Sequence, residues 1–243
     1  MIENYRIEIS YDGTDYHGWQ RQPRKKSIQG SLEKALVRIA KKETPVIGAG
    51  RTDAGVHARA QVANFMAELN LEEENLLRAL NALLPADIRV ISVKKTGPDF
   101  HARKAALSKV YQYRIFNGRN ISPFLIRYVL HLPSPLDVEK MKTASQYFVR
   151  EADFTPFSSN RLLHPVRKIL RSEIHTKGKE IIYTVEANGF LRYMVRTMVG
   201  TLLEIGKGKQ PPDIIDDLFR EKKRTLSSPT APAQGLCLIK VRY

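Results

Sequence analysis

Apolar residues alternate with polar ones at the start of the chain and then recur at helical spacing, and this change of period repeats along the sequence. Tyr5, Ile7 and Ile9 are separated by polar or charged residues, which predicts a strand over residues 4–11. The next apolar positions recur every three or four residues and predict a helix over 28–42. A strand followed by a helix is therefore the first structural unit of the chain.

The same patterns continue through the sequence and divide it into two similar halves. In the first half they predict strands over 4–11, 45–50, 59–66 and 87–95 and helices over 28–42 and 72–83. In the second half they predict strands over 107–116, 166–176, 180–187 and 236–242 and helices over 137–149, 191–206 and 211–222. The first half follows the order β-α-β-β-α-β, and the second half follows the same order with one more helix, over 211–222, before its last strand.

This repeated order predicts an α+β fold made of two tandem ferredoxin-like units, which are similar in architecture to RNA-recognition modules. Each unit is expected to hold an antiparallel sheet with helices on one face, and the two sheets are expected to meet at a central RNA-binding cleft. The predicted domains are residues 1–104 and 105–243. Because such units carry many unrelated functions, the function has to be argued from particular side chains.

The charge of the chain indicates a polyanionic partner. With 243 residues, 42% of them hydrophobic, the chain can bury a sizeable core. Its 40 Lys and Arg against 25 Asp and Glu give a formal net charge of +15, which favours nucleic acid as the partner, although a generally basic protein is the plainer alternative. No amphipathic terminal helix or lipidation signal points to a membrane, and Arg196 and Glu204 interrupt the most apolar stretch.

The sequence predicts neither a metal nor a cofactor. The 6 histidines show no ligand spacing, and the single cysteine, Cys237, can build neither a thiolate site nor an internal disulfide. The glycine-rich segment that begins at Gly48 lacks the third glycine of a dinucleotide fingerprint and the Gly-Lys-Ser/Thr of a phosphate-binding loop. The lone cysteine and the lack of an export signal predict a reducing compartment, the cytoplasm.

The segment Gly48–His57 is the strongest candidate for an active-site loop. It places Asp53 between Arg51 and His57, among three glycines that permit sharp backbone turns. Asp53 is therefore the leading catalytic candidate. Asp and Gly are also the usual turn formers, so taken alone the segment is more typical of a plain turn than of an active site.

Several short motifs occur in a fixed order along the chain. They are Tyr11-Asp12-Gly13-Thr14 with Gly18-Trp19-Gln20, Gly50-Arg51-Thr52-Asp53-Ala54-Gly55-Val56-His57, Asp99-Phe100-His101-Ala102-Arg103, Tyr111-Gln112-Tyr113, Gly189-Phe190, Met194-Val195-Arg196 and Thr230-Ala231-Pro232-Ala233-Gln234-Gly235-Leu236. In these motifs the chain resembles the TruA family of bacterial tRNA pseudouridine synthases over nearly its whole length. The segment from Arg51 to His57 is highly specific for that family, whereas Tyr-x-Tyr or Met-Val-Arg would mean little alone.

The resemblance implies a cofactor-free and metal-free isomerase that converts uridine to pseudouridine at positions 38, 39 and 40 in the anticodon stem-loop of tRNA. It also implies a homodimer in which the RNA touches both subunits. The reaction breaks the bond from N1 to C1′, rotates the detached uracil and rejoins it through C5. By resemblance Asp53 is the catalytic aspartate, and attack on uracil C6, attack on ribose C1′ and assistance of glycal formation all remain open.

Three further residues match the family's substrate-binding positions. Arg196 is implied as the partner that keeps Asp53 ionised, although its helical spacing alone favours a solvated face. Tyr111 is implied to stack on the extruded base or to lie near the proton that leaves C5, and its strand pattern equally permits sheet packing. Arg51 is implied to occupy the space that the extruded base vacates, with a phosphate clamp or a structural ion pair as alternatives.

Other polar and aromatic residues have weaker assignments. His57, His101 and Arg103 lie in matching motifs and are candidates for supporting the site from behind, or for plain scaffold residues. Trp19 either stacks on RNA or packs in the core. The basic run over 21–26 and the residues Arg161, Arg167, Lys168 and Arg171 are candidates for phosphate contacts outside the site, or are only solvated.

Two other functions compete with the isomerase. A non-catalytic RNA-binding protein would explain the net charge and the sheets but gives Asp53 no necessary role. A related enzyme that modifies other uridines shares the catalytic loop and differs in the distant basic loops that select the RNA. A hydrolase is disfavoured, because Asp53 lacks a partner carboxylate and no serine or cysteine lies in a nucleophile motif.

Overall fold

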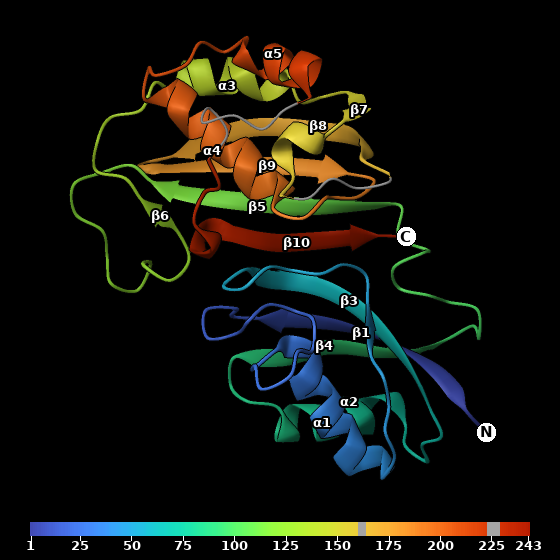
Figure 1. The fold of residues 1–243 in the computed structure, drawn as a ribbon. Coiled ribbons are helices and arrows are strands. Elements are labelled where there is room, and N and C mark those ends of the chain that lie inside the picture. The colour runs from blue at the N-terminus through green and yellow to red at the C-terminus, as the bar shows by residue number, and fades with distance from the viewer. Residues whose placement is uncertain (160–163, 223–228) are drawn as a thin grey trace. The chain divides into compact units, whose positions relative to one another are not determined.

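The computed structural model describes residues 1–159, 164–222 and 229–243 and has a mixed α+β fold (Figure 1). The contacts between Cα atoms group the chain into two compact units. The first unit comprises Met1–Leu107 together with Leu238–Tyr243, and the second comprises Ser108–Cys237. The last residues of the chain thus pack with the N-terminal unit. The predicted domain boundary between residues 104 and 105 stays a prediction.

The sheet of the first unit is antiparallel. Its strands are β1 (Glu3–Tyr11), β2 (Ile47–Gly48), β3 (His57–Ala67) and β4 (Ile88–Thr96), and the end of β10 (Leu236–Arg242) lies beside β3. The strand order is β4-β1-β3, with β2 paired to β3. Its helices are α1 (Ile28–Ala40) and α2 (Glu73–Leu83), of which α2 packs along β4 and α1 beside α2 (Figure 1).

The predicted apolar positions form the core of the first unit. Tyr5, Ile7 and Ile9 alternate along β1 and are fully buried, as the period of two requires. On α1 the side chain of Ser27 accepts a hydrogen bond from the Gly30 N–H and begins the helix. One face of α1 is buried through Leu32 and its neighbours three and four positions away. The core residues and the helix start were both readable from the sequence.

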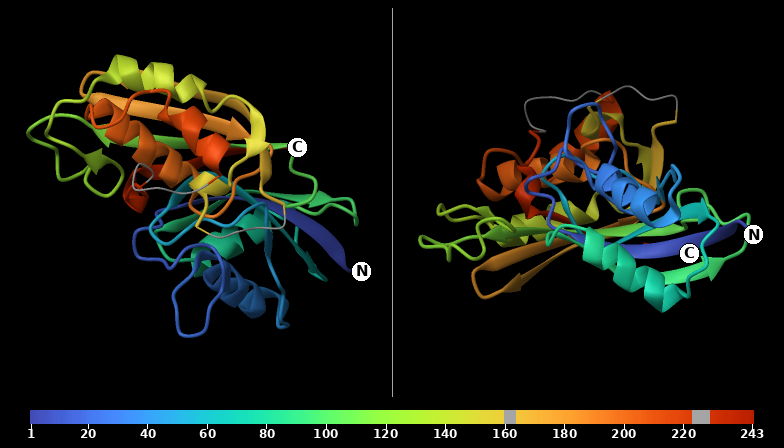
Figure 2. Two further views of the ribbon diagram at one scale, coloured as in Figure 1. Left: turned by 45° about the horizontal axis from the view of Figure 1, so that its top comes forward. Right: turned by 90° about the horizontal axis from the view of Figure 1, so that it is seen from below.

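The second unit also contains a sheet with helices packed on it. The strands β5 (Ser108–Phe116), β9 (Glu180–Ala187), β8 (Val166–Lys177) and β7 (Glu151–Asp153) follow in that order, and β6 (Leu130–His131) pairs parallel with β5. The helices are α3 (Val138–Gln146), α4 (Met194–Gly206) and α5 (Ile214–Glu221), and α3 packs on β8 and beside α4 (Figure 2).

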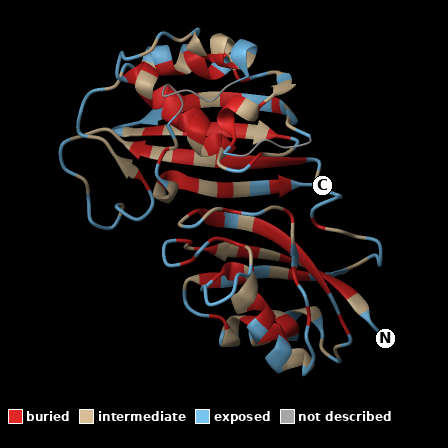
Figure 3. Ribbon diagram, viewed as in Figure 1, coloured by how far each residue is buried: buried red, intermediate tan, exposed pale blue. Residues whose placement is uncertain are grey.

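Helix α4 is the central core element of the second unit. All of its residues except Arg196 and Glu204 are buried (Figure 3), so it is a core helix rather than an amphipathic surface helix. Arg196 is thus one of two charged exceptions on an otherwise buried helix.

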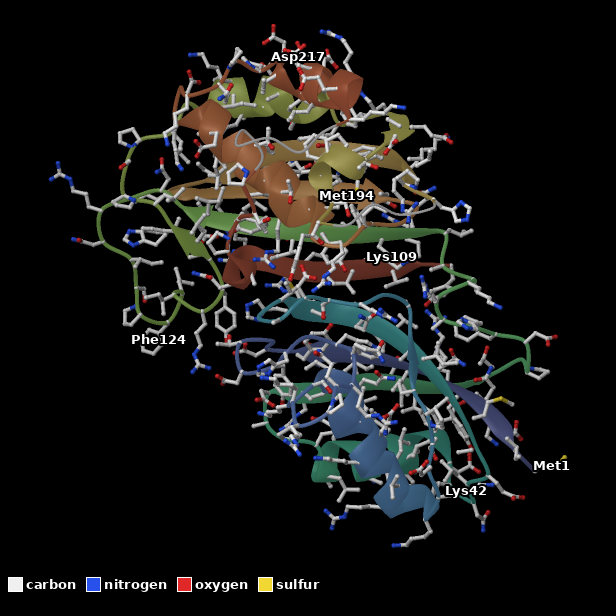
Figure 4. All side chains as sticks on the ribbon, viewed as in Figure 1. Met1, Lys42, Lys109, Phe124, Met194 and Asp217 are labelled. Carbon is white, nitrogen blue, oxygen red and sulfur yellow. The ribbon has the colours of Figure 1, made fainter. Side chains whose placement is uncertain are left out.

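The connection between β5 and β6 lies outside this core. Its residue Phe124 is 87% exposed (Figure 4).

Several predicted boundaries differ from the structure. The helix predicted over 191–206 begins at Met194, because Tyr193 has a left-handed backbone conformation that precedes regular helix. The helix predicted over 211–222 begins at Ile214, after the two prolines, and the strand predicted over 45–50 is reduced to β2. The short strands β6 and β7 were not predicted, since two or three residues carry no readable period.

Candidate active site

The loop that carries Asp53 is a tight turn with a glycine requirement. The Asp53 carbonyl accepts a hydrogen bond from the Val56 N–H at 3.2 Å. Gly55 occupies the third position of this turn with φ +77°, a left-handed conformation that favours glycine. Asp53 is half-buried and Arg51 is exposed. The turn therefore presents both side chains at the surface of the first unit.

The loop that carries Gly18 and Trp19 packs against Thr52, the residue before Asp53. Gly18 has φ +83°, and a Cβ there would lie 2.4 Å from the carbonyl oxygen of Thr52. The Trp19 N–H donates to that same carbonyl at 3.1 Å, and the Tyr11 hydroxyl lies 2.9 Å from the Thr52 hydroxyl. Because Thr52 is held by two elements, the backbone at Asp53 has little freedom to move.

His57 belongs to this scaffold and is buried. Its Nδ1 accepts a hydrogen bond from the Gly13 N–H at 3.1 Å and lies 3.1 Å from the Asp12 carboxylate. Asp12 in turn accepts hydrogen bonds from the Thr14 N–H and hydroxyl. His57 thus connects β3, the strand that follows the Asp53 loop, to the loop after β1. Trp19 is buried as well, which favours packing over RNA stacking for its ring.

The segment that carries His101 and Arg103 is bound to the sheet of the first unit by two amides. The Asn4 amide nitrogen donates to the carbonyls of Gly97, Pro98 and Phe100, and the Asn64 Oδ1 accepts from the Ala102 N–H at 2.9 Å. The C-terminal Tyr243 hydroxyl donates to the Ala102 carbonyl at 2.9 Å, and its burial raises the pKa of that phenol to about 12.

Within that segment the two candidate side chains differ in exposure. His101 is half-buried, and its Nδ1 accepts from the Arg103 N–H at 3.2 Å, whereas Arg103 is exposed. Nothing that the structure shows within the first unit places either side chain against Asp53. Their supporting role stays a prediction.

Tyr111 lies on β5 in the second unit and is 6% exposed. Its ring meets the ring of Phe190 edge-on, with centroids 5.1 Å apart. Tyr113, two residues along the same strand, is fully buried and its hydroxyl donates to the Pro232 carbonyl at 2.8 Å. Burial raises the pKa of Tyr113, and Arg196 opposes that rise. Tyr113 is therefore a neutral donor at neutral pH.

Arg196 is anchored to the segment before β10. Its Nε donates to the Ala231 carbonyl at 2.8 Å, and its own carbonyl accepts from the Ala231 N–H at 2.9 Å. These two bonds join α4 to the segment at Ala231. The solvated helix face that spacing alone favoured is wrong, because Arg196 is half-buried and its helix is a core helix.

Tyr193 is a residue that the sequence analysis missed. It precedes α4 with φ +62° and ψ +1°, a conformation that costs a residue with a side chain about 1–2 kcal/mol. Its ring centroid lies 5.1 Å from the guanidinium carbon of Arg196 and 4.9 Å from that of Arg192. The only signal in the sequence was the three-residue spacing from Tyr193 to Arg196, since a left-handed tyrosine has no signature.

Replacing Gly200 with alanine is expected to destabilise the second unit. A Cβ at this position would lie 1.8 Å from the Pro229 carbonyl oxygen, so α4 and the segment that holds Arg196 would have to separate. Overpacking of this kind costs roughly 1–3 kcal/mol of unfolding free energy. Thermal unfolding should show a midpoint lowered by roughly 3–10 °C. The matched control is Gly97→Ala, where nothing lies within 4 Å of the new Cβ; equal midpoints for the two variants would contradict the close packing.

The structure brings the predicted residues together in two groups. Arg51 and Asp53 lie in one loop of the first unit, which His57 at the start of β3 follows, and Tyr111 and Arg196 lie on β5 and α4 of the second. Of the predicted phosphate contacts, Arg161 lies outside the described residues. Among the described residues, no three His, Cys, Asp or Glu side chains gather as a metal site would, and no helix is long and apolar enough to cross a membrane.

The family match and the similar sequences point to one family. Residues 8–103 and 144–243 match the family described as tRNA pseudouridine synthase. The chain is 42% identical to "tRNA pseudouridine synthase A 2" of Clostridium perfringens over 245 residues, which cover 100% of both chains. It is 43% identical to "tRNA pseudouridine synthase A" of Limosilactobacillus fermentum over 252 residues, which cover 100% of this chain and 96% of the relative. A chain in the crystal structure of the archaeal box H/ACA sRNP Nop10-Cbf5 complex aligns at 13% identity with a TM-score of 0.33, over 83% of this chain and 53% of that chain.

Proposed function

The chain belongs to the tRNA pseudouridine synthase family, and we propose that it isomerises uridine in tRNA with Asp53 as the catalytic residue. The observation that carries this proposal is the Asp53 turn. It retains the whole Arg-Thr-Asp-Ala-Gly-Val-His segment, and Tyr11, Gly18 and Trp19 hold its backbone while Asp53 stays half-exposed. A rigid backbone with an accessible carboxylate is what a positioned nucleophile requires. Membership of an isomerase family disfavours the alternative of a non-catalytic RNA-binding protein.

The carboxylate of Asp53 can make and break the bonds of the reaction. The substrate loses its bond from N1 to C1′ and gains one from C5 to C1′; the hydrogen at C5 leaves as a proton and N1 takes up a proton, so the product is an isomer of uridine. Asp53 assists by attacking C6 or C1′, or by taking a proton from the ribose to give a glycal. In each route the carboxylate starts ionised and is regenerated.

Arg196 and Tyr111 are proposed as substrate-binding residues, together with Arg51. Arg196 supports Asp53 by favouring its charged form, and the anchor from its Nε to Ala231 supports a fixed direction for that charge. Tyr111 offers a ring already held by Phe190, on which an extruded uracil can stack. Arg51 is exposed beside the turn and can enter the space that the base leaves.

The proposed substrate is the anticodon stem-loop of tRNA at positions 38, 39 and 40, and the proposed assembly is a homodimer in the cytoplasm. The net charge of +15 supports a polyanionic substrate. A tandem ferredoxin-like architecture is also proposed. The first unit supports it, because its strands lie in the antiparallel order β4-β1-β3-β2 and because α1 connects β1 to β2 and α2 connects β3 to β4.

Mapping of pseudouridine in an unmodified tRNA transcript tests this function. The transcript is incubated with the protein and then treated with a carbodiimide that marks pseudouridine as a stop for reverse transcription. Stops at 38, 39 or 40, absent when uridine at those positions is replaced by cytidine, are expected. Stops only elsewhere would reassign the substrate to another uridine, and a transcript without stops would contradict the proposed function.

A further inference from the structure

A basic groove runs along α1 in the first unit. Its lining residues come before the Asp53 turn in the chain. The groove has a volume of about 790 Å³ and is lined by residues of three segments: the loop before α1, one side of α1, and the loop between α1 and β2. Its charged lining residues are Arg21, Arg24, Lys25, Lys26, Lys34 and Arg38, with Glu33 and Glu43 as the acids. The excess of four positive charges makes it a site for an anion with several charges.

The walls of the groove are held in place by two side chains of α1, the half-buried Gln29 and the buried Glu33. Gln29 accepts hydrogen bonds from the Arg21 N–H and the Gln20 amide and donates to the Val46 carbonyl. Glu33 is 8% exposed; one of its oxygens accepts from the Val46 N–H, and the other lies 3.2 Å from Arg21. Both flanking loops are thus tied to the same helix, so the groove is preformed.

Four of the cations in this groove lack a nearby acid. Arg24, Lys25, Lys34 and Arg38 have no carboxylate within 4.0 Å among the described residues, whereas Lys26 lies 3.4 Å from Asp87. Arg24 sits in a left-handed conformation, φ +56°, at the tip of a turn closed by the Lys25 N–H and the Gln22 carbonyl. Cations without an ion pair on a preformed surface can bind an anion at a small cost in free energy, because no ion pair has to break and no loop has to be ordered.

We propose that this groove binds the phosphodiester backbone of the substrate tRNA, at nucleotides other than the one that reacts. The proposal rests on the proposed function for the identity of the RNA and on the groove for the site. Cations spread over the loop before α1 and along one side of α1 fit a chain of phosphates better than a single small anion, because each phosphate can meet its own side chain.

The test compares two double variants with the same loss of charge. Lys34→Gln with Arg38→Gln removes two cations from the groove, whereas Lys42→Gln with Arg78→Gln removes two exposed cations outside it (Figure 4 labels Lys42). Dissociation constants for tRNA are measured between about 50 and 200 mM salt. For the groove variant the slope of log Kd against log salt is expected to fall by about 1.5, with roughly tenfold weaker binding near 0.1 M salt.

Binding without turnover keeps this test separate from the catalytic one. A groove variant whose Kd and salt slope equal those of the control variant would overturn the proposal, even if pseudouridine forms normally. If no pseudouridine forms with the native protein, the proposed function fails, and the difference between the two double variants still decides whether the groove binds RNA.

A separate observation in the second unit concerns Tyr193. This tyrosine keeps a left-handed backbone, and its ring lies beside Arg196, whose Nε is anchored to Ala231. The ring and the Ala231 carbonyl thus contact the same guanidinium, one through a cation–π contact and the other through a hydrogen bond at Nε. The geometry points to Tyr193 as a positioning residue that orients Arg196 for the reaction; this inference rests on the proposed role of Arg196.

Two substitutions of Tyr193 distinguish the effect of its ring on the reaction from the effect of its left-handed backbone. Tyr193→Phe keeps the ring, and Tyr193→Asn removes it while asparagine tolerates a left-handed backbone. Single-turnover rates at saturating tRNA are expected to be near the native value for Tyr193→Phe and about tenfold lower for Tyr193→Asn, with tRNA affinity changed less than twofold in both.

Equal rates for the native protein and Tyr193→Asn would overturn the positioning role, as would equal losses in both variants. Arg196→Ala, which removes the charge, is measured beside them. A native rate in Arg196→Ala would place the failure in the proposed role of Arg196 rather than in Tyr193.

Discussion

Replacing Asp53 with asparagine is expected to abolish pseudouridine formation while leaving folding and tRNA binding almost unchanged. The amide has nearly the shape of the carboxylate but cannot act as a nucleophile or base, so a single-turnover rate lower by at least roughly 10⁴-fold is expected. The turn itself should persist, because the Asp53 carbonyl, Gly55 and the contacts to Thr52 all remain in the variant.

The control for Asp53→Asn is the conservative change at a neighbouring position of the same turn. Ala54 is exposed beside Asp53, and Ala54→Ser adds a polar atom without touching the carboxylate. This variant is expected to keep tRNA affinity and thermal midpoint equal to those of Asp53→Asn. If Asp53→Asn instead lost tRNA affinity in parallel with its activity, the residue would be a binding group and not the catalytic one.

Replacing Arg196 with alanine has the second largest expected effect. The guanidinium is held at Nε by the Ala231 carbonyl, so its remaining nitrogens form a fixed charge that needs no reorganisation during the reaction. Loss of one such preorganised group typically lowers a rate by about 10²–10³-fold. A rate lower by that factor, measured at saturating tRNA, is the expected result.

Arg196→Ala also removes the anchor to Ala231, so its stability has to be measured beside its activity. The matched control is Arg220→Ala, an exposed arginine of the same unit that pairs with Asp217. The thermal midpoint of Arg196→Ala should fall by only a few degrees relative to this control. A rate equal to the native one in a folded Arg196→Ala protein would remove Arg196 from the site.

The sequence predicted most of the elements because their periods are long and regular. Strand β1 and helix α1 each contain several repeats of one hydrophobic period. Their buried residues Tyr5, Ile7, Ile9 and Leu32 are apolar positions of that period. Strand β2 could not be sized from sequence, because its two paired residues have no period. The early start predicted for α4 failed for a different reason, since no local rule predicts a left-handed tyrosine.

The candidate site was predictable only where a motif was dense. The turn at Asp53 could be placed because its glycines and aspartate lie within one short segment. The anchor of Arg196 joins it to Ala231, which lies on another segment of the second unit. In the first unit, the amides of Asn4 and Asn64 bind Phe100 and Ala102 far along the chain. Such contacts depend on the tertiary fold, and neither spacing nor composition encodes them.

Release of tritium from tRNA that carries 5-tritiated uridine tests the central claim most directly. Joining C5 to C1′ must expel the hydrogen at C5, so each pseudouridine formed frees one tritium into water. The account predicts release by the native protein, none by Asp53→Asn, and none from a tRNA without uridine at positions 38, 39 and 40. Undiminished release by Asp53→Asn, or no release by a native protein that binds tRNA tightly, would contradict it.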